Sequence, residues 1–236
     1  MIRAFVGYDP REAAAYHVFC QSVIERASVP VQFVPLHRPM LSGFDGQRDG
    51  TNAFIFSRFL VPQLMGFDNE WAAFFDGDMV MRTDIAELWK LRDPTRALMV
   101  VKHDYKTKHP RKYLGSPIEN DNVDYPRKNW SSVMLFNCGH YSNRILTRQF
   151  VNEAPGHFLH RFDWLRDAQI GELPQSWNAL EGEQDTTAAD LVHYTLGVPG
   201  FSHYRETGGD WNSTLINALH VVGEKPTQMV ERAWQR

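Results

Sequence analysis

The sequence predicts an α/β domain with a mixed, mostly parallel sheet flanked by helices and a less regular C-terminal part. Strand-like and helix-like segments alternate from residue 2 to residue 153, the order expected when helices connect parallel strands. Residues 71–75 and 97–101 are continuous apolar runs, which are typical of strands buried on both faces. We expect one domain, because 236 residues can bury a sizeable core and no internal repeat divides them.

The composition excludes several classes of protein. Hydrophobic residues make up 43% and charged residues 22% of the chain, as in ordinary soluble globular proteins. A formal net charge of −3 gives no reason to expect nucleic acid or an anionic membrane as the main partner. The first residues lack the features of a signal peptide, and no segment approaches a membrane span. We therefore expect a cytoplasmic protein, with peripheral membrane association left open, in which Cys20 and Cys138 are reduced core residues.

Residues 2–6 form the first expected strand, and the helix that follows has a strong start signal. Asp9, Pro10 and Glu12 suit its N-cap, N1 and N3 positions. Its apolar stripe recurs at helical spacing and consists of Tyr16, Phe19, Cys20, Val23, Ile24 and Ala27. A strand whose turn feeds a helix N-terminus can bind an anion or a nucleotide, so Asp9 is either a helix cap or a ligand contact. The residues alone favour the cap.

Residues 31–36 predict a second strand, and Pro35 indicates an edge position or a strand end. A loop at 37–50 and a helix of about 52–64 follow, and Pro62 should kink or end that helix. Arg58 lies among phenylalanines in this helix. Either it pairs with an anionic group, or its stem packs on the surface while the guanidinium stays in water.

The most informative stretch is 71–81, where Asp76 and Asp78 follow an apolar run. In extended backbone, residues two apart point the same way, so we expect both carboxylates side by side at the end of one strand. Adjacent carboxylates repel each other unless a cation lies between them, and a hard divalent cation held by two carboxylates keeps positions open for substrate phosphates. Gly77 would let such a phosphate approach the backbone. The alternative is an ordinary turn, because Asp-Gly pairs are common in turns.

The remaining segments continue the alternation and then lose it. We expect a helical turn at 85–89, strands at 97–101 and 131–137, a helix at about 142–153, a short strand at 191–194 and a surface helix at 226–236. The loop at 102–113 is either a solvated face or one wall of an acceptor cleft, and its basic residues are Lys102, Lys106, Lys108, Arg111 and Lys112. A lone histidine is more often packed than a ligand, but the glycine-proline loop after residue 194 could bring His193 against the two aspartates.

An ordered set of motifs resembles glycosyltransferase family 8, whose members have the GT-A fold. The resemblance spans most of the chain and rests on Gly7-Tyr8-Asp9, Ser57-Arg58-Phe59, Phe75-Asp76-Gly77-Asp78 as the D-x-D motif, residues 130–137, Leu173-Pro174 with Trp177-Asn178, and His193 with Gly197. It implies a nucleotide-sugar donor, usually a UDP-sugar, a Mn²⁺ or Mg²⁺ ion, and transfer to a saccharide or glycoconjugate acceptor with retention of configuration. It also implies a nucleotide-binding half of about 1–100 and an acceptor-side half of about 101–236.

Carried over by position, the resemblance assigns roles to individual residues. Asp76, Asp78 and His193 resemble the metal ligands. The residues that resemble donor contacts are Gly7, Tyr8, Asp9 (at the uracil), Arg58, Asp76, Gly77, Ser131 and Gly197. Asp167 and Gln169 resemble the catalytic pair of an acid and an amide, although an alanine separates them where the family has them adjacent.

Two departures from the family pattern suggest a divergent subgroup. The terminal H-x-x-G-x-x-K-P-W pattern becomes His193-Tyr-Thr-Leu-Gly197-Val-Pro-Gly-Phe201, without the lysine that clamps the diphosphate, and we name Arg205 as its substitute. Ser131 stands where the family has an asparagine that touches the sugar.

The leading hypothesis is a metal-dependent hexosyltransferase that builds a polysaccharide or glycoconjugate, and two alternatives stay open. A sugar-1-phosphate nucleotidyltransferase would normally carry a basic, glycine-rich loop after the first strand, where this chain has the single Gly7. A non-catalytic nucleotide-sugar binding module is compatible with the missing lysine. The residues do not decide between front-face transfer and a double displacement with Asp167 as nucleophile.

Overall fold

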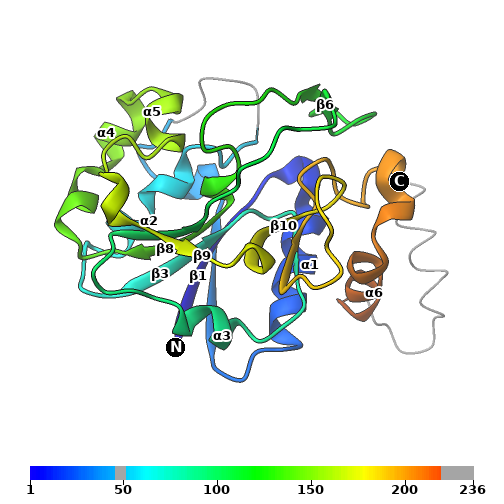
Figure 1. The fold of residues 1–236 in the computed structure, drawn as a ribbon, viewed down its shortest axis with the longest axis horizontal. Coiled ribbons are helices and arrows are strands. Elements are labelled where there is room, and N and C mark those ends of the chain that lie inside the picture. Colours follow the sequence, from blue (N-terminus) through cyan, green and yellow to red (C-terminus); the bar gives the residue numbers. More distant parts are fainter. Residues whose placement is uncertain (46–51, 219–236) are drawn as a thin grey trace.

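A six-stranded mixed sheet forms the centre of the molecule in the computed structural model, which describes residues 1–45 and 52–218 (Figure 1). The strands are β1 (Ile2–Gly7), β2 (Val31–Leu36), β3 (Trp71–Phe75), β5 (Leu98–Val101), β8 (Val133–Asn137) and β9 (Ile170–Leu173), in the order β2-β1-β3-β8-β5-β9. β1 runs parallel to β2 and β3, β9 runs parallel to β5, and β8 alone is antiparallel to its neighbours β3 and β5. The predicted α/β class with a mostly parallel sheet is therefore confirmed.

Helices cover both faces of this sheet, as the continuous apolar strands require. On one face, Phe74 and Phe136 join a core that includes Phe59 and Phe162, and the helices α2 (Val61–Leu64), α4 (Arg148–Glu153) and α5 (Gly156–His160) gather on this side (Figure 1). On the other face, Phe75 packs against Phe19 of α1 (Ala13–Ile24), with ring centroids 5.0 Å apart. α3 (Ile85–Lys90) completes that layer.

A second sheet of three short strands lies beside the first and helps to determine which face of α1 is buried. It contains β4 (Met79–Met81), β10 (Ala179–Leu180) and β11 (Leu191–His193), in the order β10-β11-β4. α1 packs between the two sheets, because Phe19 faces the large sheet while Val18 joins a core with Val80 of β4 and Trp211 of α6 (Gly209–Ala218). The buried face of α1 is therefore turned toward Val18, and Ile24, which we expected on it, is 60% exposed.

The stretch 71–81 is not one strand. β3 ends at Phe75, the chain bends through Asp76, Gly77 and Asp78, and β4 then joins the second sheet. The extended backbone that we expected between the two aspartates is absent, because the chain passes here from one sheet to the other.

Several predicted helices are shorter than expected. The predicted helix at 52–64 is a turn, a 3-10 helix (Ser57–Leu60) and α2, and Pro62 lies in the first turn of α2, where its missing N–H leaves no helical bond unmade. The predicted helix at 142–153 is split into a 3-10 helix (Tyr141–Ile145) and α4, because Thr147 caps α4 by accepting a hydrogen bond from the Phe150 N–H.

The sequence analysis did not predict β9, β10, α5 or α6, while other segments lie close to their predicted positions. β2 lies at a sheet edge, as Pro35 indicated, and β11 spans 191–193. The basic loop contains a small hairpin of β6 (Arg111–Lys112) and β7 (Asn120–Asp121). Short 3-10 helices also occur at Pro10–Glu12, Arg38–Met40, Trp130–Ser132, Asp167–Gln169, Gln175–Asn178 and Ser202–Thr207. The predicted helix at 226–236 and residues 46–50 of the predicted loop lie outside the described residues.

Both cysteines are free thiols, and Cys138 is fully buried. Among residues 1–45 and 52–218, no helix has both the length and the apolar character that crossing a bilayer requires.

Candidate metal centre and adjoining cavity

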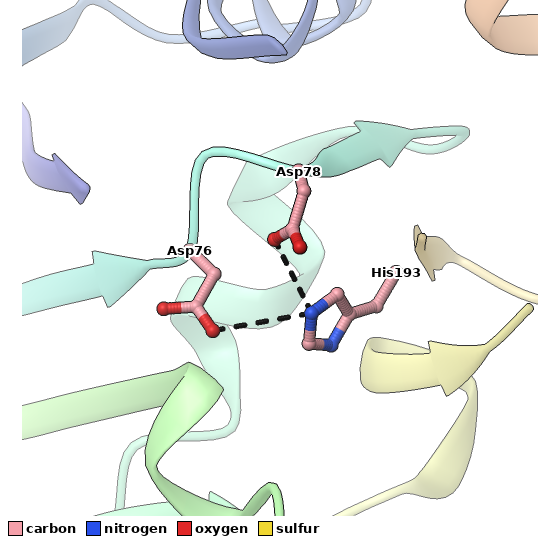
Figure 2. A group of neighbouring side chains, drawn as sticks. All are labelled: Asp76, Asp78 and His193. Atoms are coloured by element: carbon pink, nitrogen blue, oxygen red, sulfur yellow. Dashed lines mark ion pairs between the residues drawn. The ribbon is translucent and has the colours of Figure 1, made fainter. Parts of the chain in front are cut away.

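Three side chains from distant parts of the chain converge where the two sheets meet. Figure 2 shows Asp76 at the end of β3, Asp78 before β4 and His193 at the end of β11, all pointing toward one another. The Nε2 atom of His193 lies 3.2 Å from an Asp78 carboxylate oxygen and 3.9 Å from an Asp76 oxygen. β-Sheet pairing fixes this arrangement, because His193 lies opposite Met79 in the antiparallel pair of β11 and β4. One atom from each of the three side chains falls within 4.8 Å of the others.

A hydrogen-bond chain fixes which nitrogen of His193 carries the proton. The Asn178 side-chain nitrogen donates to the Ser132 hydroxyl (2.8 Å) and to the Asn129 carbonyl (3.3 Å), so the Asn178 oxygen is the atom that faces His193. That oxygen lies 3.0 Å from Nδ1 of His193 and accepts a hydrogen bond from it. In the neutral imidazole, Nε2 then presents a lone pair to the two carboxylates, and a cation between them would offset the repulsion.

The donor set fits a divalent metal ion. Asp78 and His193 are each 2% exposed, and one buried oxygen of Asp78 has no hydrogen-bond partner. Burial raises the pKa of Asp76 to about 6, and the neighbouring Asp78 adds to the rise while Arg58 opposes it. Two carboxylates and one neutral imidazole are ligands that first-row divalent ions accept, and such a set leaves coordination positions open. The convergence of Asp76, Asp78 and His193 was predicted by the resemblance.

Arg58 has the anionic partner that its apolar surroundings require. Its guanidinium lies 2.8 Å from an Asp76 oxygen, donates to the Ser131 carbonyl (2.9 Å), and lies over the rings of Phe54 and Phe74. Arg58 is buried, so this ion pair holds the Asp76 side chain in one orientation. The interpretation as an arginine stem packed on the surface is wrong.

Asp9 is a helix cap. It accepts hydrogen bonds from the backbone N–H groups of Arg11 and Ala53, both at 2.9 Å, and from the Arg11 guanidinium. Burial acts to raise the pKa of Asp9, but these hydrogen bonds outweigh it and lower the pKa. The carboxylate is 2% exposed, so its bonds within the chain account for its position, and a contact with a uracil stays a prediction. Tyr8 lies beside it in edge contact with Tyr16 and His37.

The glycines of the predicted donor site bring two turns close together. A Cβ on Gly77 would lie 2.6 Å from the carbonyl oxygen of Gly7, and a Cβ on Gly7 would collide with the Phe54 ring. The end of β1 therefore touches the aspartate turn directly. This close approach of main chain to main chain requires glycine at position 77, whether or not a phosphate also approaches it.

A cavity of about 340 Å³ adjoins Asp76. The basic and polar side chains that line it include Arg58, Lys112, Lys128, Ser131, His160 and Arg161. Ser131, predicted at the sugar, is 2.8 Å from Nδ1 of His160. Burial lowers the pKa of His160 to about 3, so its imidazole is neutral at pH 7. The sequence analysis did not identify His160 or Arg161 as cavity residues. It identified Lys112 only as one of the basic residues of the loop at 102–113.

The predicted catalytic pair does not line this cavity. Asp167 lies in the 3-10 helix before β9, is paired with Arg127 at 2.5 Å, and has an 88% exposed side chain. The Gln169 amide closes a local network: its oxygen accepts from the Arg166 N–H, and its nitrogen donates to Tyr141 and Ser142. The catalytic roles of both residues stay predictions.

Two further predicted residues lie elsewhere. Gly197 and Tyr204 line a separate, smaller cavity, and a Cβ on Gly197 would collide with the Tyr204 ring. Arg205 is exposed on the 3-10 helix Ser202–Thr207 and is not among the residues that line the large cavity.

This mixed sheet, with an Asp-Gly-Asp turn at the end of a central strand, has the GT-A glycosyltransferase fold. The chain superposes on the bifunctional glycosyltransferase WbbM with a TM-score of 0.63 and 12% identity, over 100% of this chain and 52% of that one, so it spans about half the length of WbbM. The galactosyltransferase LgtC, solved with donor and acceptor sugar analogs, gives a TM-score of 0.55 and 12% identity over 94% of this chain and 98% of LgtC. GlyE of Streptococcus pneumoniae TIGR4 gives 0.57 and 12% over 99% of this chain and 63% of GlyE.

The chain belongs to the family of Protein CDI from Arabidopsis thaliana. The two are 44% identical over 216 residues, which cover 86% of this chain and 81% of that protein. No protein-family model matches the chain.

Proposed function

We propose that this protein is a metal-dependent glycosyltransferase that transfers a hexose from a nucleotide-sugar, preferably a UDP-sugar, to a saccharide or glycoconjugate acceptor. The observation that supports it most is the convergence of Asp76, Asp78 and the Nε2 lone pair of His193 beside a basic cavity. A diphosphate joined to a sugar matches such a site, because its phosphates suit the cation and the basic groups while its sugar suits the polar wall.

The chain's own residues have distinct parts in the proposed reaction. Asn178 holds the His193 ring so that its Nε2 faces the two aspartates, and Arg58 fixes the Asp76 carboxylate. A bound Mn²⁺ or Mg²⁺ would neutralise charge on the departing diphosphate as a Lewis acid. The bond that breaks joins the anomeric carbon to a phosphate oxygen, and the bond that forms joins that carbon to an acceptor hydroxyl oxygen, whose proton must be removed.

We favour retention by front-face transfer, in which the leaving phosphate accepts the acceptor proton. A double displacement needs a carboxylate against the anomeric carbon. In the described residues, the carboxylates that line the cavity are Asp76, which faces His193 and Arg58, and Asp121, which is paired with Arg111 at 2.9 Å. Both carboxylates already have partners within the chain, so neither is free to act as the nucleophile, and Asp167 does not line the cavity.

A non-catalytic nucleotide-sugar binding module is the second candidate. The position of Asp167 and Gln169 outside the large cavity favours it, since these residues were the predicted catalytic pair. Such a module would bind donors in a metal-dependent way without consuming them. We also propose that the protein acts in the cytoplasm, in the synthesis of a polysaccharide or glycoconjugate.

Replacement of Asp78 tests the proposed activity. We expect Asp78→Asn to abolish release of UDP from a panel of UDP-sugars, because one of the metal ligands is lost while the shape of the side chain is kept. Circular dichroism should show an unchanged fold. Asp121→Asn, in the β6–β7 hairpin, is the matched carboxylate control and should keep measurable turnover. Turnover of Asp78→Asn equal to that of the unmodified protein would contradict the proposal.

A further inference from the structure

Among the described residues, four lysine and arginine side chains line the large cavity, and they differ in what they already bind. Arg58 is paired with Asp76. Lys128 is 7% exposed, and its ammonium donates to the Asn122 side chain (2.8 Å) and lies 3.3 Å from Asp124. Both charges are therefore satisfied within the chain. The remaining two are Lys112 and Arg161.

Lys112 has no ion-pair partner among residues 1–45 and 52–218. Its ammonium contacts the face of the Tyr113 ring, with the nitrogen 5.1 Å from the ring centroid, and forms none of the hydrogen bonds or ion pairs found in that part of the chain. A half-buried ammonium loses part of its hydration, and a cavity wall that leaves it unpaired lacks the compensating anion. An anionic ligand in the cavity would supply that compensation.

The fold anchors Lys112 close to the metal centre. It lies in β6 opposite Asn120 of β7. The next residue, Tyr113, is buried with a φ of 57° and donates its backbone N–H to the Leu196 carbonyl at 2.6 Å. The hairpin is thereby attached to the loop that follows His193, so the backbone that carries Lys112 has a fixed position relative to the metal ligands.

The interactions of Lys112 with neighbouring charges indicate at which end of the cavity its ammonium lies. Burial lowers the pKa of Lys112, and the charges of Asp78 and Asp76 act in the opposite direction. Arg161 also lines the cavity, with a buried Nε that lacks a hydrogen-bond partner. We place Lys112 rather than Arg161 at the metal end because the β6–β7 hairpin is attached to the loop that follows His193, and the charge of Lys112 acts on Asp76.

We propose that Lys112 binds the diphosphate group of a ligand held at the metal centre of Asp76, Asp78 and His193, so that the diphosphate is neutralised by the metal on one side and by the Lys112 ammonium on the other. This inference rests on the proposed function only for the sugar and the nucleoside attached to the diphosphate. The role of the missing lysine that clamps the diphosphate is thereby assigned to Lys112 of the β6–β7 hairpin and not to Arg205. An ammonium suits the role because it is a compact point charge that phosphate oxygens accept without a fixed orientation.

The proposal predicts effects of opposite sign on two ligands. In Lys112→Gln, we expect the affinity for inorganic pyrophosphate, titrated calorimetrically at saturating Mn²⁺, to fall at least about tenfold, since one charge-assisted contact with a phosphate oxygen is lost. The affinity for Mn²⁺ alone should stay the same or rise, because a like charge near the cation is removed. Retained Mn²⁺ binding also shows that the variant folds. Lys112→Arg keeps the charge and should keep most of the pyrophosphate affinity.

Lys106→Gln is the matched control, because Lys106 is an exposed lysine of the same loop that does not line the cavity. It should bind pyrophosphate as the unmodified protein does. The proposal is overturned if Lys112→Gln binds pyrophosphate with unchanged affinity, if Arg161→Gln loses more affinity than Lys112→Gln, or if the unmodified protein with Mn²⁺ does not bind pyrophosphate. If pyrophosphate binding behaves as expected and no UDP-sugar is consumed, the role of Lys112 stands and the proposed transferase activity fails.

Discussion

The orientation of one imidazole determines whether the three candidate ligands can hold a metal ion. His193 can present a lone pair to a cation only while its Nδ1 keeps the proton, and the Asn178 side-chain oxygen is what holds that proton in place. Asn178 is fully buried and is itself oriented by Ser132 and Asn129. Three uncharged residues, Asn178, Ser132 and Asn129, thus orient the ring nitrogen that faces the two aspartates.

Loss of the Asn178 side chain should therefore weaken metal binding. We expect Asn178→Ala to reduce Mn²⁺ affinity by about 10- to 100-fold, the usual effect of removing an outer-shell partner of a metal-binding histidine. Calorimetric titration of Mn²⁺ into metal-free protein measures it. Asn143→Ala removes another fully buried asparagine, one that bonds the Ala97 and Asn137 carbonyls, and should leave Mn²⁺ affinity unchanged while also lowering stability. Equal Mn²⁺ affinities in the two variants would contradict this assignment.

Glu12 is a buried carboxyl whose ionisation opposes folding. It is 7% exposed, its Oε2 atom has no hydrogen-bond partner, and it makes no capping bond to α1. Burial raises the pKa of Glu12 well above its ordinary value, and the charges of Asp78, Asp9 and Asp76 add to the rise. A raised pKa in the folded state means that the neutral carboxyl's contribution to stability is complete below the ordinary pKa and is lost as pH rises through the raised one.

Glu12→Gln should consequently stabilise the metal-free protein at high pH and not at low pH. In EDTA, we expect its melting temperature to exceed that of the unmodified protein at pH 8, with a difference that shrinks toward pH 4.5. Each 1 kcal/mol recovered corresponds to about 2–4 °C for a domain of this size. Glu206→Gln, at an exposed position, should show no such pH dependence. A difference that does not change between pH 4.5 and pH 8 would show that Glu12 is not a buried, uncompensated acid.

At the scale of elements, the three candidate metal ligands come together because a turn joins two sheets. β3 is a central strand of the large sheet, β4 is an edge strand of the small one, and the three residues between them carry both aspartates. β11 pairs with β4, which brings His193 back to the same turn. Tyr194 then donates its N–H to the Asp78 carbonyl at 2.9 Å and closes the connection. The site is thus supported by backbone pairing on two sides.

The tight contact at Gly77 makes this turn sensitive to a single methyl group. A Cβ there would lie 2.6 Å from the Gly7 carbonyl oxygen, which belongs to the backbone and cannot move aside cheaply. We expect Gly77→Ala to cost about 1–3 kcal/mol in the free energy of unfolding, the usual range for overpacking, and to lower Mn²⁺ affinity by displacing the aspartates. Urea denaturation with a parallel Mn²⁺ titration measures both.

Gly209→Ala is the control for this prediction. A Cβ at Gly209 meets no atom within 4 Å, so its replacement should be neutral or slightly stabilising. If Gly77→Ala were as stable as Gly209→Ala and bound Mn²⁺ normally, the close approach of Gly7 and Gly77 would not be needed for the site.

At the scale of the whole molecule, the sequence predicted the layers better than the connections. Continuous apolar runs such as 71–75 and 97–101 report burial on both faces directly, and the structure places them in a sheet covered on both sides. Such runs do not indicate the direction of a strand relative to its neighbours, so the antiparallel direction of β8 could not be predicted. β9 was missed because its four residues include Gly171 and Glu172, which weaken a strand pattern.

For the candidate site, the sequence likewise predicted the residues better than their arrangement in space. The ligand triad was predictable because the D-x-D motif and the distant histidine resemble a known pattern. Periodicity gave the wrong geometry for it, since it assumed one extended strand where the chain changes sheets. Lys112 could be found in the sequence only as one basic residue of a loop, because its proximity to Asp76 depends on long-range packing of the β6–β7 hairpin.

The central claim is that Asp76, Asp78 and His193 hold a metal ion that binds the diphosphate of a nucleotide-sugar, and calorimetric titration of UDP into the unmodified protein tests it most directly. We predict binding of UDP with Mn²⁺, weaker binding of GDP and ADP, and loss of binding when EDTA replaces Mn²⁺. Equal binding of UDP with Mn²⁺ and with EDTA, or no binding of any of the three nucleotides, would contradict it.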